Sequence, residues 1–309
     1  MSCMTAPSYE LVTLKGGARS IRSTAHGETM HIGTDPCTEA MELHVGQQRL
    51  AERVAAWAGP APFVIWDIGL GPAANAISAI VAVNDLEGVG MEGKSVEIHS
   101  YEIDTSVLEF SLQHAEALRY LAGWEATVGE LLASGVTRPA PGMTWHLHRG
   151  DFSRSRPAAP SPSSIFFDPY SPARNAEMWS LETFRMIRDA VSDPDAPDCT
   201  MTNYTRSTSV RVTMLLAGWF VGTGVPTGEK EETTIAANRP GLLEKPLDGA
   251  WLTRVRSSTN SSPLRGRNYE RGPISPEDYA RLIAHPQFAH PRFSQRTATA
   301  RRSGRDCGS

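Results

Sequence analysis

Short apolar runs alternate with helical patterns through most of the chain. Runs of apolar or alternating residues predict strands at 63–66, 95–101, 143–147, 165–167 and 200–204. Apolar positions at spacings of three and four predict helices near 76–83, 108–118, 178–191 and 207–217. Two more strands, at 218–221 and 232–237, flank a loop of Gly, Pro and Thr and form a hairpin with an antiparallel edge strand. Strands that alternate with helices predict an α/β fold with a mostly parallel sheet.

The two ends of the chain are less regular than its middle. Residues 1–60 predict a polar N-terminal extension with a helical segment that Thr38 caps and that Gly59 and Pro60 end. Residues 61–240 carry the alternating pattern and form the predicted main domain. From 241 to 309 the pattern weakens, and we expect an irregular, Arg-rich tail with one short helix over 276–284.

A carboxylate stands at the end of four predicted strands: Asp67, Glu102, Asp151 and Asp168. In open α/β sheets, ligands bind at the carboxyl ends of the strands. The first three suggest a nucleoside cofactor, with Asp67 near an amino group, Glu102 on the ribose hydroxyls and Asp151 near the adenine amine. Asp168 begins a rigid loop, because Pro169 follows it directly. It either caps this turn or faces a ligand.

A glycine turn follows the first of these strands. Gly69 and Gly71 form a GxG turn that lets a ligand approach the backbone, and a helix begins directly after it. The dinucleotide pattern asks for a third glycine where Ala74 stands, and the methyltransferase pattern asks for one where Ala73 stands. An extra methyl group should be tolerated if the residue has helical dihedral angles. A lone GxG turn is a weak signal.

Charge, cysteine spacing and the length of apolar runs indicate which partners the protein can have. The net charge is −4 over 309 residues, but it is +7 from residue 250 onward and −11 before it, which suggests an anionic partner for the tail. The four cysteines are far apart and form no Cys/His cluster, so we expect no metal site and no disulfide framework. The longest apolar run, 73–83, is too short to span a bilayer. With no signal peptide expected, we predict a cytoplasmic protein without membrane partners.

Four segments within residues 15–240 resemble the methyltransferase part of the MnmC-type tRNA wobble-uridine enzymes. They are HGETMHIGTDPCTEAMELHVGQQRL, FVIWDIGLGPAAN, FFDPYSPARNAEMWSLETF, and TNYTRSTSVRVTMLLAGWFV with GEKEETTIA. The third segment is the most specific. Two departures are the missing third glycine and Pro169, which stands where the family has Gly. Larger members also carry a flavin oxidase domain. A second GxGxxG is absent here, so we expect a separate oxidoreductase to act on the same tRNA.

The resemblance implies a Rossmann-like class I methyltransferase fold with a seven-stranded sheet and a C-terminal hairpin. It also implies S-adenosyl-L-methionine as cofactor and methyl transfer to the aminomethyl nitrogen of a modified wobble uridine. Asp168 would be the catalytic residue that accepts a hydrogen bond from the amine. The implied cofactor-binding residues are Asp67, Gly69, Gly71, Asn75, Glu102, Asp151 and Phe152, and the implied substrate-binding residues are Tyr170, Met178, Trp179 and Thr205.

Other interpretations remain open. YEIDTSVLEFS and FFDPYSPA are also similar to segments of the aminopropyltransferases that make polyamines. These enzymes share the fold and use an Asp near an amine, but their GGGDG-like loop is absent. A small-molecule alkyltransferase and a non-catalytic binding protein are therefore the alternatives. Trp179 either walls in the uracil or is a core residue of the helix that follows it.

Overall fold

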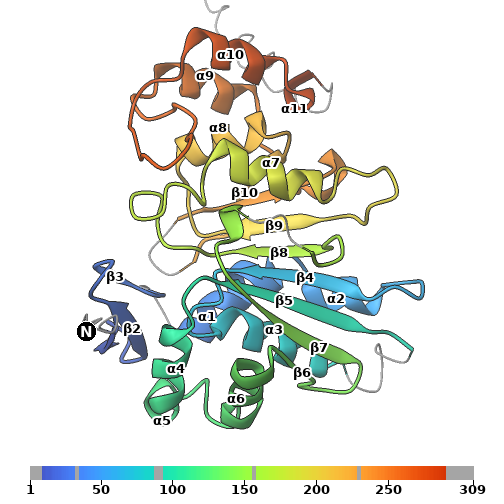
Figure 1. Cartoon of the computed structure of the whole chain (residues 1–309). Helices are drawn as coiled ribbons and strands as arrows, with labels where there is room; N and C mark the ends of the chain where they lie inside the picture. Colours follow the sequence, from blue (N-terminus) through green and yellow to red (C-terminus); the bar gives the residue numbers. More distant parts are fainter. Residues whose placement is uncertain (1–8, 32–34, 87–92, 155–157, 228–230, 290–309) are drawn as a thin grey trace, which may run out of the picture.

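A computed structural model describes residues 9–31, 35–86, 93–154, 158–227 and 231–289 (Figure 1). Cys3, Cys307 and the five arginines from 292 to 305 that contribute to the positive tail lie outside these ranges. The described residues centre on an eight-stranded sheet with the order β10-β11-β9-β8-β4-β5-β7-β6. Its strands are β4 (Phe63–Ile68), β5 (Val96–Glu102), β6 (Val136–Thr137), β7 (Met143–Arg149), β8 (Ser164–Phe167), β9 (Thr200–Asn203), β10 (Phe220–Gly224) and β11 (Thr233–Ala237).

The sheet confirms the mostly parallel arrangement and changes two details. Strands β7, β5, β4, β8 and β9 are parallel neighbours. The antiparallel strand of the hairpin, β11, lies between β9 and β10 and is not at the edge, so its predicted edge position is wrong. The opposite edge carries β6, a two-residue strand that the sequence pattern did not predict. It makes the expected seven-stranded sheet eight-stranded.

Helices cover both faces of the sheet (Figure 1). One core contains apolar side chains of α3 (Ala74–Asn84), α4 (Ser106–Gln113), α5 (Ala115–Leu118) and α6 (Glu125–Ser134). The other contains those of α7 (Leu181–Asp189) and α8 (Thr208–Leu216). Serines cap α7 and α8: the hydroxyls of Ser180 and Ser207 accept from the backbone N–H groups of Thr183 and Val210. All four predicted central helices are present.

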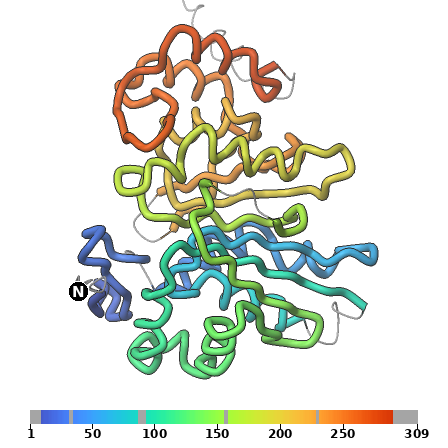
Figure 2. The backbone as a smooth tube through the Cα atoms, viewed as in Figure 1, coloured from blue at the N-terminus to red at the C-terminus, as the bar shows by residue number. Residues whose placement is uncertain are grey.

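The N-terminal region is more ordered than expected. It begins with a three-stranded antiparallel sheet of β1 (Tyr9–Thr13), β2 (Arg19–Ser23) and β3 (Glu28–Thr29). The helical segment follows as α1 (Pro36–Ala40), a π-helical stretch (Met41–Gly46) and α2 (Leu50–Ala55). Asp35, and not Thr38, caps α1, because its carboxylate accepts from the N–H groups of Cys37 and Thr38 at 3.1 Å. Figure 2 shows the three small strands, in dark blue, at one side of the molecule.

A buried glutamine ties the N-terminal segment to the sheet. The Gln48 amide N–H2 donates to Ile165 O at 3.0 Å and to the Thr202 hydroxyl at 2.8 Å. Its carbonyl oxygen accepts from the hydroxyls of Ser164 at 2.8 Å and Thr200 at 2.6 Å. Both amide donors and both carbonyl lone pairs are thus used inside the protein. This segment is therefore an integral part of the fold.

The chain after residue 240 is folded as far as residue 289. It forms a 3-10 turn (Pro240–Leu242), α9 (Gly249–Ser257), α10 (Pro276–Ile283) and α11 (Pro286–Ala289). The short helix expected over 276–284 is confirmed as α10, but the expected irregular tail is wrong for these residues. Trp251, Val255, Leu264 and Leu282 are buried in the same core as α7 and α8. The weak sequence pattern reflects short helices that bury only a few residues each.

Two further observations complete the fold. Among the described residues, Cys37 and Cys199 are free thiols. Helices of the length and apolar character that a membrane span requires are not found in the described ranges.

Candidate active site

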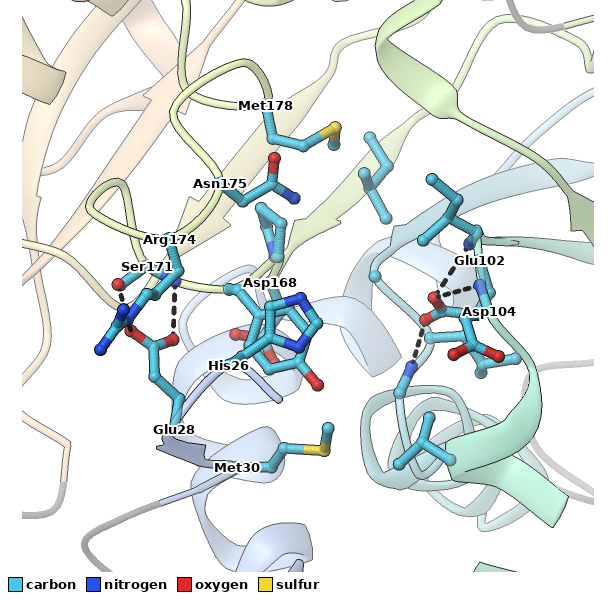
Figure 3. Close-up of a pocket in the computed structure, with 18 of the residues that line it drawn as sticks. His26, Glu28, Met30, Glu102, Asp104, Asp168, Ser171, Arg174, Asn175 and Met178 are labelled. Carbon is cyan, nitrogen blue, oxygen red and sulfur yellow. Dashed lines mark hydrogen bonds and ion pairs between the residues drawn. The ribbon is translucent and has the colours of Figure 1, made fainter. Parts of the chain in front are cut away.

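A cavity of about 730 Å³ opens at the carboxyl ends of β4, β5, β7 and β8. Residues that follow these four strands form its floor, and residues of the small N-terminal sheet form its roof (Figure 3). The cavity brings together most of the predicted site residues. Those on its wall are Gly69, Gly71, Asn75, Glu102, Asp151, Phe152, Asp168, Tyr170 and Met178.

The glycine turn that follows β4 packs closely against the loop that begins at Asp168. Gly69 has a φ of +91°, and a Cβ there would lie 2.8 Å from Asp168 O, so only glycine fits. Gly71 has a φ of +52° and donates its N–H to Glu102. Ala73 is fully buried in the left-handed region at φ +68°, which costs an L-residue about 1–2 kcal/mol. The condition for tolerating an extra methyl group, right-handed helical dihedral angles, is thus met at Ala74 and not at Ala73.

Glu102 is held by the backbone around it. One carboxylate oxygen accepts from Gly71 N at 2.9 Å, and the other accepts from Ile103 N at 2.9 Å and Asp104 N at 3.1 Å (Figure 3). Burial raises the pKa of Glu102, and the three backbone donors oppose that rise. Each carboxylate oxygen has two lone pairs, so the oxygen bound to Gly71 can accept one more donor. The group is fixed in place and retains capacity for a ligand hydroxyl.

The third strand end supplies an aromatic wall and a second carboxylate. Phe152 packs edge-on against Tyr101 with ring centroids 4.8 Å apart, and both line the cavity. Asp151 accepts from Ser153 N at 3.1 Å and forms an ion pair with Arg154 at 2.8 Å. An apolar ring with a carboxylate at its edge suits a purine base that carries an amino group.

Asp67 does not line the cavity, contrary to its predicted place beside the cofactor. The sequence pattern ended the strand at 66, but β4 continues to Ile68, so Asp67 lies within the strand and its side chain points into a buried layer. The Ser100 hydroxyl donates to Asp67 at 2.7 Å, and the Trp145 indole N–H donates to that hydroxyl at 2.8 Å. Burial raises the pKa of Asp67 to about 7.

Asp168 lies at the end of β8 and is oriented by a side chain from the start of α3. The Asn75 side-chain N–H2 donates to Asp168 Oδ2 at 2.8 Å. Asn75 belongs to the first turn of α3, so the glycine turn and the Asp168 loop meet through both backbone and side chains. The other amide atom, Asn75 Oδ1, is buried on the cavity wall without a hydrogen-bond partner among the described residues. An unpaired buried acceptor at this place fits a site that receives a ligand donor.

The pKa of a histidine on the cavity wall, His31, is raised. His31 Nδ1 lies 3.4 Å from Glu39 Oε2, and both residues line the cavity. Burial alone would lower the pKa of His31, but the hydrogen bond to Glu39 and the charge of Asp168 outweigh it, so this pKa is raised. The sequence pattern gave His31 no role.

The roof of the cavity is built by Glu28 and His26 of the N-terminal segment. Glu28 accepts from Ser171 N at 3.1 Å and from the Ser171 hydroxyl, and it lies 4.0 Å from the Arg174 guanidinium (Figure 3). The His26 ring stacks on Tyr170 at 4.2 Å. Both contacts hold the loop that follows Asp168. Sequence analysis missed these residues, because nothing near them in the sequence marks partners more than 140 positions away.

Three of the four predicted substrate residues have structural contacts that limit their role. Tyr170 lines the cavity, but His26 covers one face of its ring. Trp179 is fully buried and donates its indole N–H to Tyr170 O at 2.8 Å, which agrees with the core interpretation. Thr205 is not on the cavity wall; its hydroxyl accepts from Ser207 N in the turn before α8. Met178 lines the cavity.

The residues present fit a nucleoside cofactor such as adenosylmethionine. Glu102 offers a carboxylate with a free lone pair, Phe152 an aromatic wall, and Asn75 an unpaired buried acceptor. The cavity also has room for a second ligand group beside Asp168, since it extends from Glu102 to the Glu28 roof.

Comparisons with known proteins agree with this geometry. Residues 142–239 match the family model described as S-adenosyl-L-methionine-dependent methyltransferase. The crystal structure of MNMC2 from Aquifex aeolicus has a TM-score of 0.63 and 18% identity, and the match covers 91% of this chain and 84% of that one. The fold is therefore that of the class I methyltransferases, and the family match agrees with an adenosylmethionine site in the cavity.

Two curated proteins are similar to parts of this chain. The tRNA 5-methylaminomethyl-2-thiouridine biosynthesis bifunctional protein MnmC of Aeromonas hydrophila is 23% identical over 249 residues, or 75% of this chain and 36% of that protein. The MnmC protein of Methylibium petroleiphilum is 31% identical over 91 residues, or 29% and 13% of the two chains. The chain thus spans about a third or less of the length of these relatives.

Proposed function

We propose that this chain transfers a methyl group from adenosylmethionine to the aminomethyl nitrogen of a modified tRNA wobble uridine. The observation that carries the proposal is Asp168, which lies at the end of β8, in the same cavity as Glu102 and bound to Asn75. The names of the MnmC relatives support the tRNA substrate. The proposal includes a separate oxidoreductase that acts on the same tRNA.

The chemistry needs a neutral, well-oriented amine. A free alkylamine has a pKa near ~10 and is mostly protonated at neutral pH, and a partly desolvated cavity lowers that pKa. Asp168 accepts a hydrogen bond from the amine and thereby aims the nitrogen lone pair. The bound cofactor supplies an electrophilic methyl group. Because alignment of the two reactants provides much of the rate, the fixed position of Asp168 is its main contribution.

The positive C-terminal region supplies charge for RNA in this proposal. Several described arginines are already paired there: Arg265 and Arg281 contact Asp278, and Arg267 contacts Glu177. The five arginines after residue 289 add further positive charge. A truncation near residue 250 would remove buried Trp251 and Val255, so a deletion must begin after Ala289.

That deletion tests the role of the last residues. Phosphate contacts make log affinity fall linearly with log salt, by about one unit per contact. We expect the truncated chain to show weaker tRNA binding and a shallower salt dependence, with cofactor affinity unchanged. Filter binding at several salt concentrations measures both quantities. Equal affinity and equal slope would refute a role for these residues in RNA binding.

The decisive experiment compares two substrates in one assay. Purified protein and methyl-labelled cofactor are incubated with tRNA that carries an aminomethyl wobble uridine, and the nucleosides are analysed by mass spectrometry. We expect one added methyl group on that uridine. Turnover only with a diamine and decarboxylated cofactor would identify an aminopropyltransferase, and cofactor binding without either turnover would identify a binding protein. Nucleoside analysis of tRNA from cells with and without the gene tests the same proposal in vivo.

A further inference from the structure

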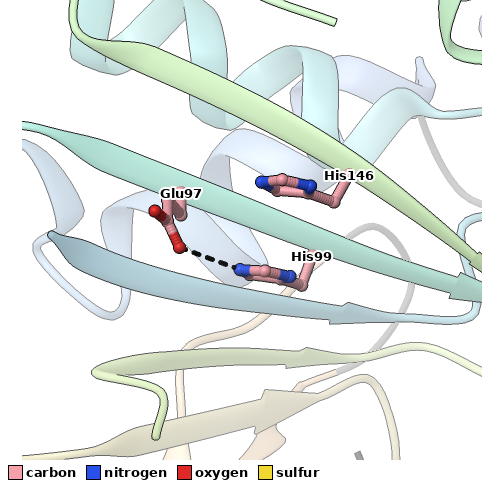
Figure 4. A group of neighbouring side chains, drawn as sticks. All are labelled: Glu97, His99 and His146. Atoms are coloured by element: carbon pink, nitrogen blue, oxygen red, sulfur yellow. Dashed lines mark hydrogen bonds and ion pairs between the residues drawn. The ribbon is translucent and has the colours of Figure 1, made fainter. Parts of the chain in front are cut away.

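Two neighbouring strands carry a cluster of imidazoles and one carboxylate outside the cavity. Glu97 and His99 lie two residues apart on β5, and His146 is the register partner of His99 on β7. Residues two apart on a strand, and register partners on parallel strands, project from the same face of a sheet. Figure 4 shows the three side chains together on these strands; one ligand atom from each lies within 4.8 Å of the other two. None of the three lines the cavity.

This face of the sheet is partly open. Parallel strands are usually connected through a helix that covers the sheet. Between β7 and β8, the described residues form only a 3-10 turn (Phe152–Arg154) before the loop reaches Pro160, whose carbonyl accepts from the Trp66 indole over β4. The Glu97 side chain is 30% exposed and that of His99 is 6% exposed. An ion from solvent can reach the cluster past Glu97 and the half-buried His146.

The cluster is already arranged in a defined hydrogen-bonded chain. His99 Nε2 lies 3.2 Å from Glu97 Oε2, and His99 Nδ1 lies 2.9 Å from His148 Nε2. An ionised carboxylate only accepts, so His99 donates from Nε2 to Glu97 and accepts at Nδ1 from His148. The rings of His99 and His146 are stacked 4.6 Å apart and nearly parallel.

We propose that Glu97, His99 and His146 bind one divalent transition-metal ion, with zinc as the best match. Two imidazole nitrogens and one carboxylate oxygen are ligands that zinc accepts, and a fourth position remains for water. The ion takes the place of the hydrogen between His99 Nε2 and Glu97. His99 and His148 both change tautomer and stay neutral, and His99 Nδ1 then donates to His148. Such a donation from the second ring nitrogen is the usual arrangement of a metal-bound histidine.

The required movement is small. Ligand atoms around tetrahedral zinc lie about 3.4 Å apart, given bond lengths near 2.1 Å. Glu97 must therefore move inward by about 1 Å, and the His146 ring, which is stacked on His99, must turn so that its nitrogen lone pair points at the ion. The partial exposure of Glu97 and His146 permits both changes. Occupancy would tie β5 to β7, beside the Tyr101 and Phe152 wall of the cavity, because Tyr101 stacks on His148 at 4.7 Å.

The test uses the full chain, freed of metal with a chelator. Isothermal titration with zinc chloride gives stoichiometry and affinity, and cobalt substitution gives a visible absorption spectrum. The informative variants are Glu97→Gln and His146→Ala, both half-buried, with His114→Ala as the matched control. His114 lies at the end of α4 and bonds Phe110 O instead of the cluster. Circular dichroism of each metal-free variant verifies folding, and all variants keep the cysteines.

We expect one zinc ion per chain with a Kd of about 1 μM or below, together with a higher melting temperature. Glu97→Gln and His146→Ala should each weaken binding by about 100-fold. His148→Ala, which removes only the partner of His99, should weaken binding by about 10-fold. His114→Ala should bind as the wild type does. Absence of binding up to millimolar zinc, or wild-type affinity in Glu97→Gln or His146→Ala, would overturn the proposal.

Discussion

The cavity has two halves that are built in different ways. On the proposed cofactor side, Glu102 is fixed by backbone N–H groups of its own loop and of the glycine turn. On the proposed substrate side, the loop after Asp168 is fixed by side chains of a distant segment, with Glu28 binding Ser171 and His26 stacking on Tyr170. Backbone contacts depend little on side-chain identity, whereas the roof depends on a few specific residues. We therefore expect mutations to separate the two halves.

The largest expected effect is that of Asp168→Asn. The amide keeps the size and one acceptor oxygen but loses the charge that favours an amine donor. Methyl transfer should fall by about 100-fold or more, as for loss of a positioned acid–base group, with little change in cofactor affinity. Single-turnover methylation of tRNA measures the rate, and Asp189→Asn on the exposed side of α7 is the control. An active Asn variant would reduce Asp168 to a cap of its turn.

Glu102→Gln should weaken cofactor binding and leave the methylation rate at saturating cofactor nearly unchanged, which is the reverse of the effect expected for Asp168→Asn. Loss of a charged hydrogen bond should weaken cofactor binding by ~1–3 kcal/mol. The rate at saturating cofactor should change much less, because Glu102 does not contact the reacting amine in this proposal. Calorimetry measures the affinity, and Glu109→Gln, exposed on α4, is the control. Unchanged affinity would remove Glu102 from the cofactor site.

Glu28→Gln tests whether the roof serves only the substrate side. A glutamine offers one acceptor oxygen in place of two, so it cannot bind both Ser171 donors and Arg174 as Glu28 does. We expect kcat/KM for tRNA to fall about 10-fold and cofactor affinity to stay constant. Steady-state kinetics with Glu10→Gln on β1 as the control measure this. An equal loss of cofactor binding would show that the two halves are coupled.

Asp67→Asn should leave both halves intact and change the pH dependence of stability. Burial raises the pKa of folded Asp67 to about 7, well above its unfolded value. Its contribution to stability is complete below about pH 4 and is lost as pH rises to about 7. Relative to the variant, the wild-type free energy of unfolding should fall by about 1 kcal/mol per pH unit in this window. Urea unfolding at pH 4.5 and 7.5 measures it; parallel curves would contradict the assignment.

The sequence predicts the proposed cofactor side of the cavity better than the roof and the C-terminal helices, because its residues are close together in the chain. Strand β4, the glycine turn and the carboxylate Glu102 lie within 40 residues of one another, and strand ends leave a clear pattern. Asp67 was predicted at a strand end, but it lies within β4, because the strand continues for two residues beyond its apolar run. The left-handed dihedral angles of Ala73 could not be predicted because the turn sets them, and not the residue type.

Other features depend on contacts that no local pattern shows. Glu28 and Ser171 are 143 residues apart, and His99 meets His146 only because β5 and β7 are neighbours. A search for closely spaced Cys and His residues therefore finds no metal site. Helices α9 and α11 were missed because each buries few apolar residues, whereas α10 was predicted.

The buried Gln48 has a consequence for the synthesis of the chain. Its four partners lie 116 to 154 residues further along the sequence. A ribosome that adds about 5–20 residues per second thus delivers the last partner, Thr202, roughly 10–30 seconds after Gln48 itself. Until Ser164 is added, Gln48 has none of these partners, and the set is complete only when Thr202 follows. The segment up to α2, which ends at Ala55 of 309 residues, is therefore made early but can complete its packing only after β9 has been translated.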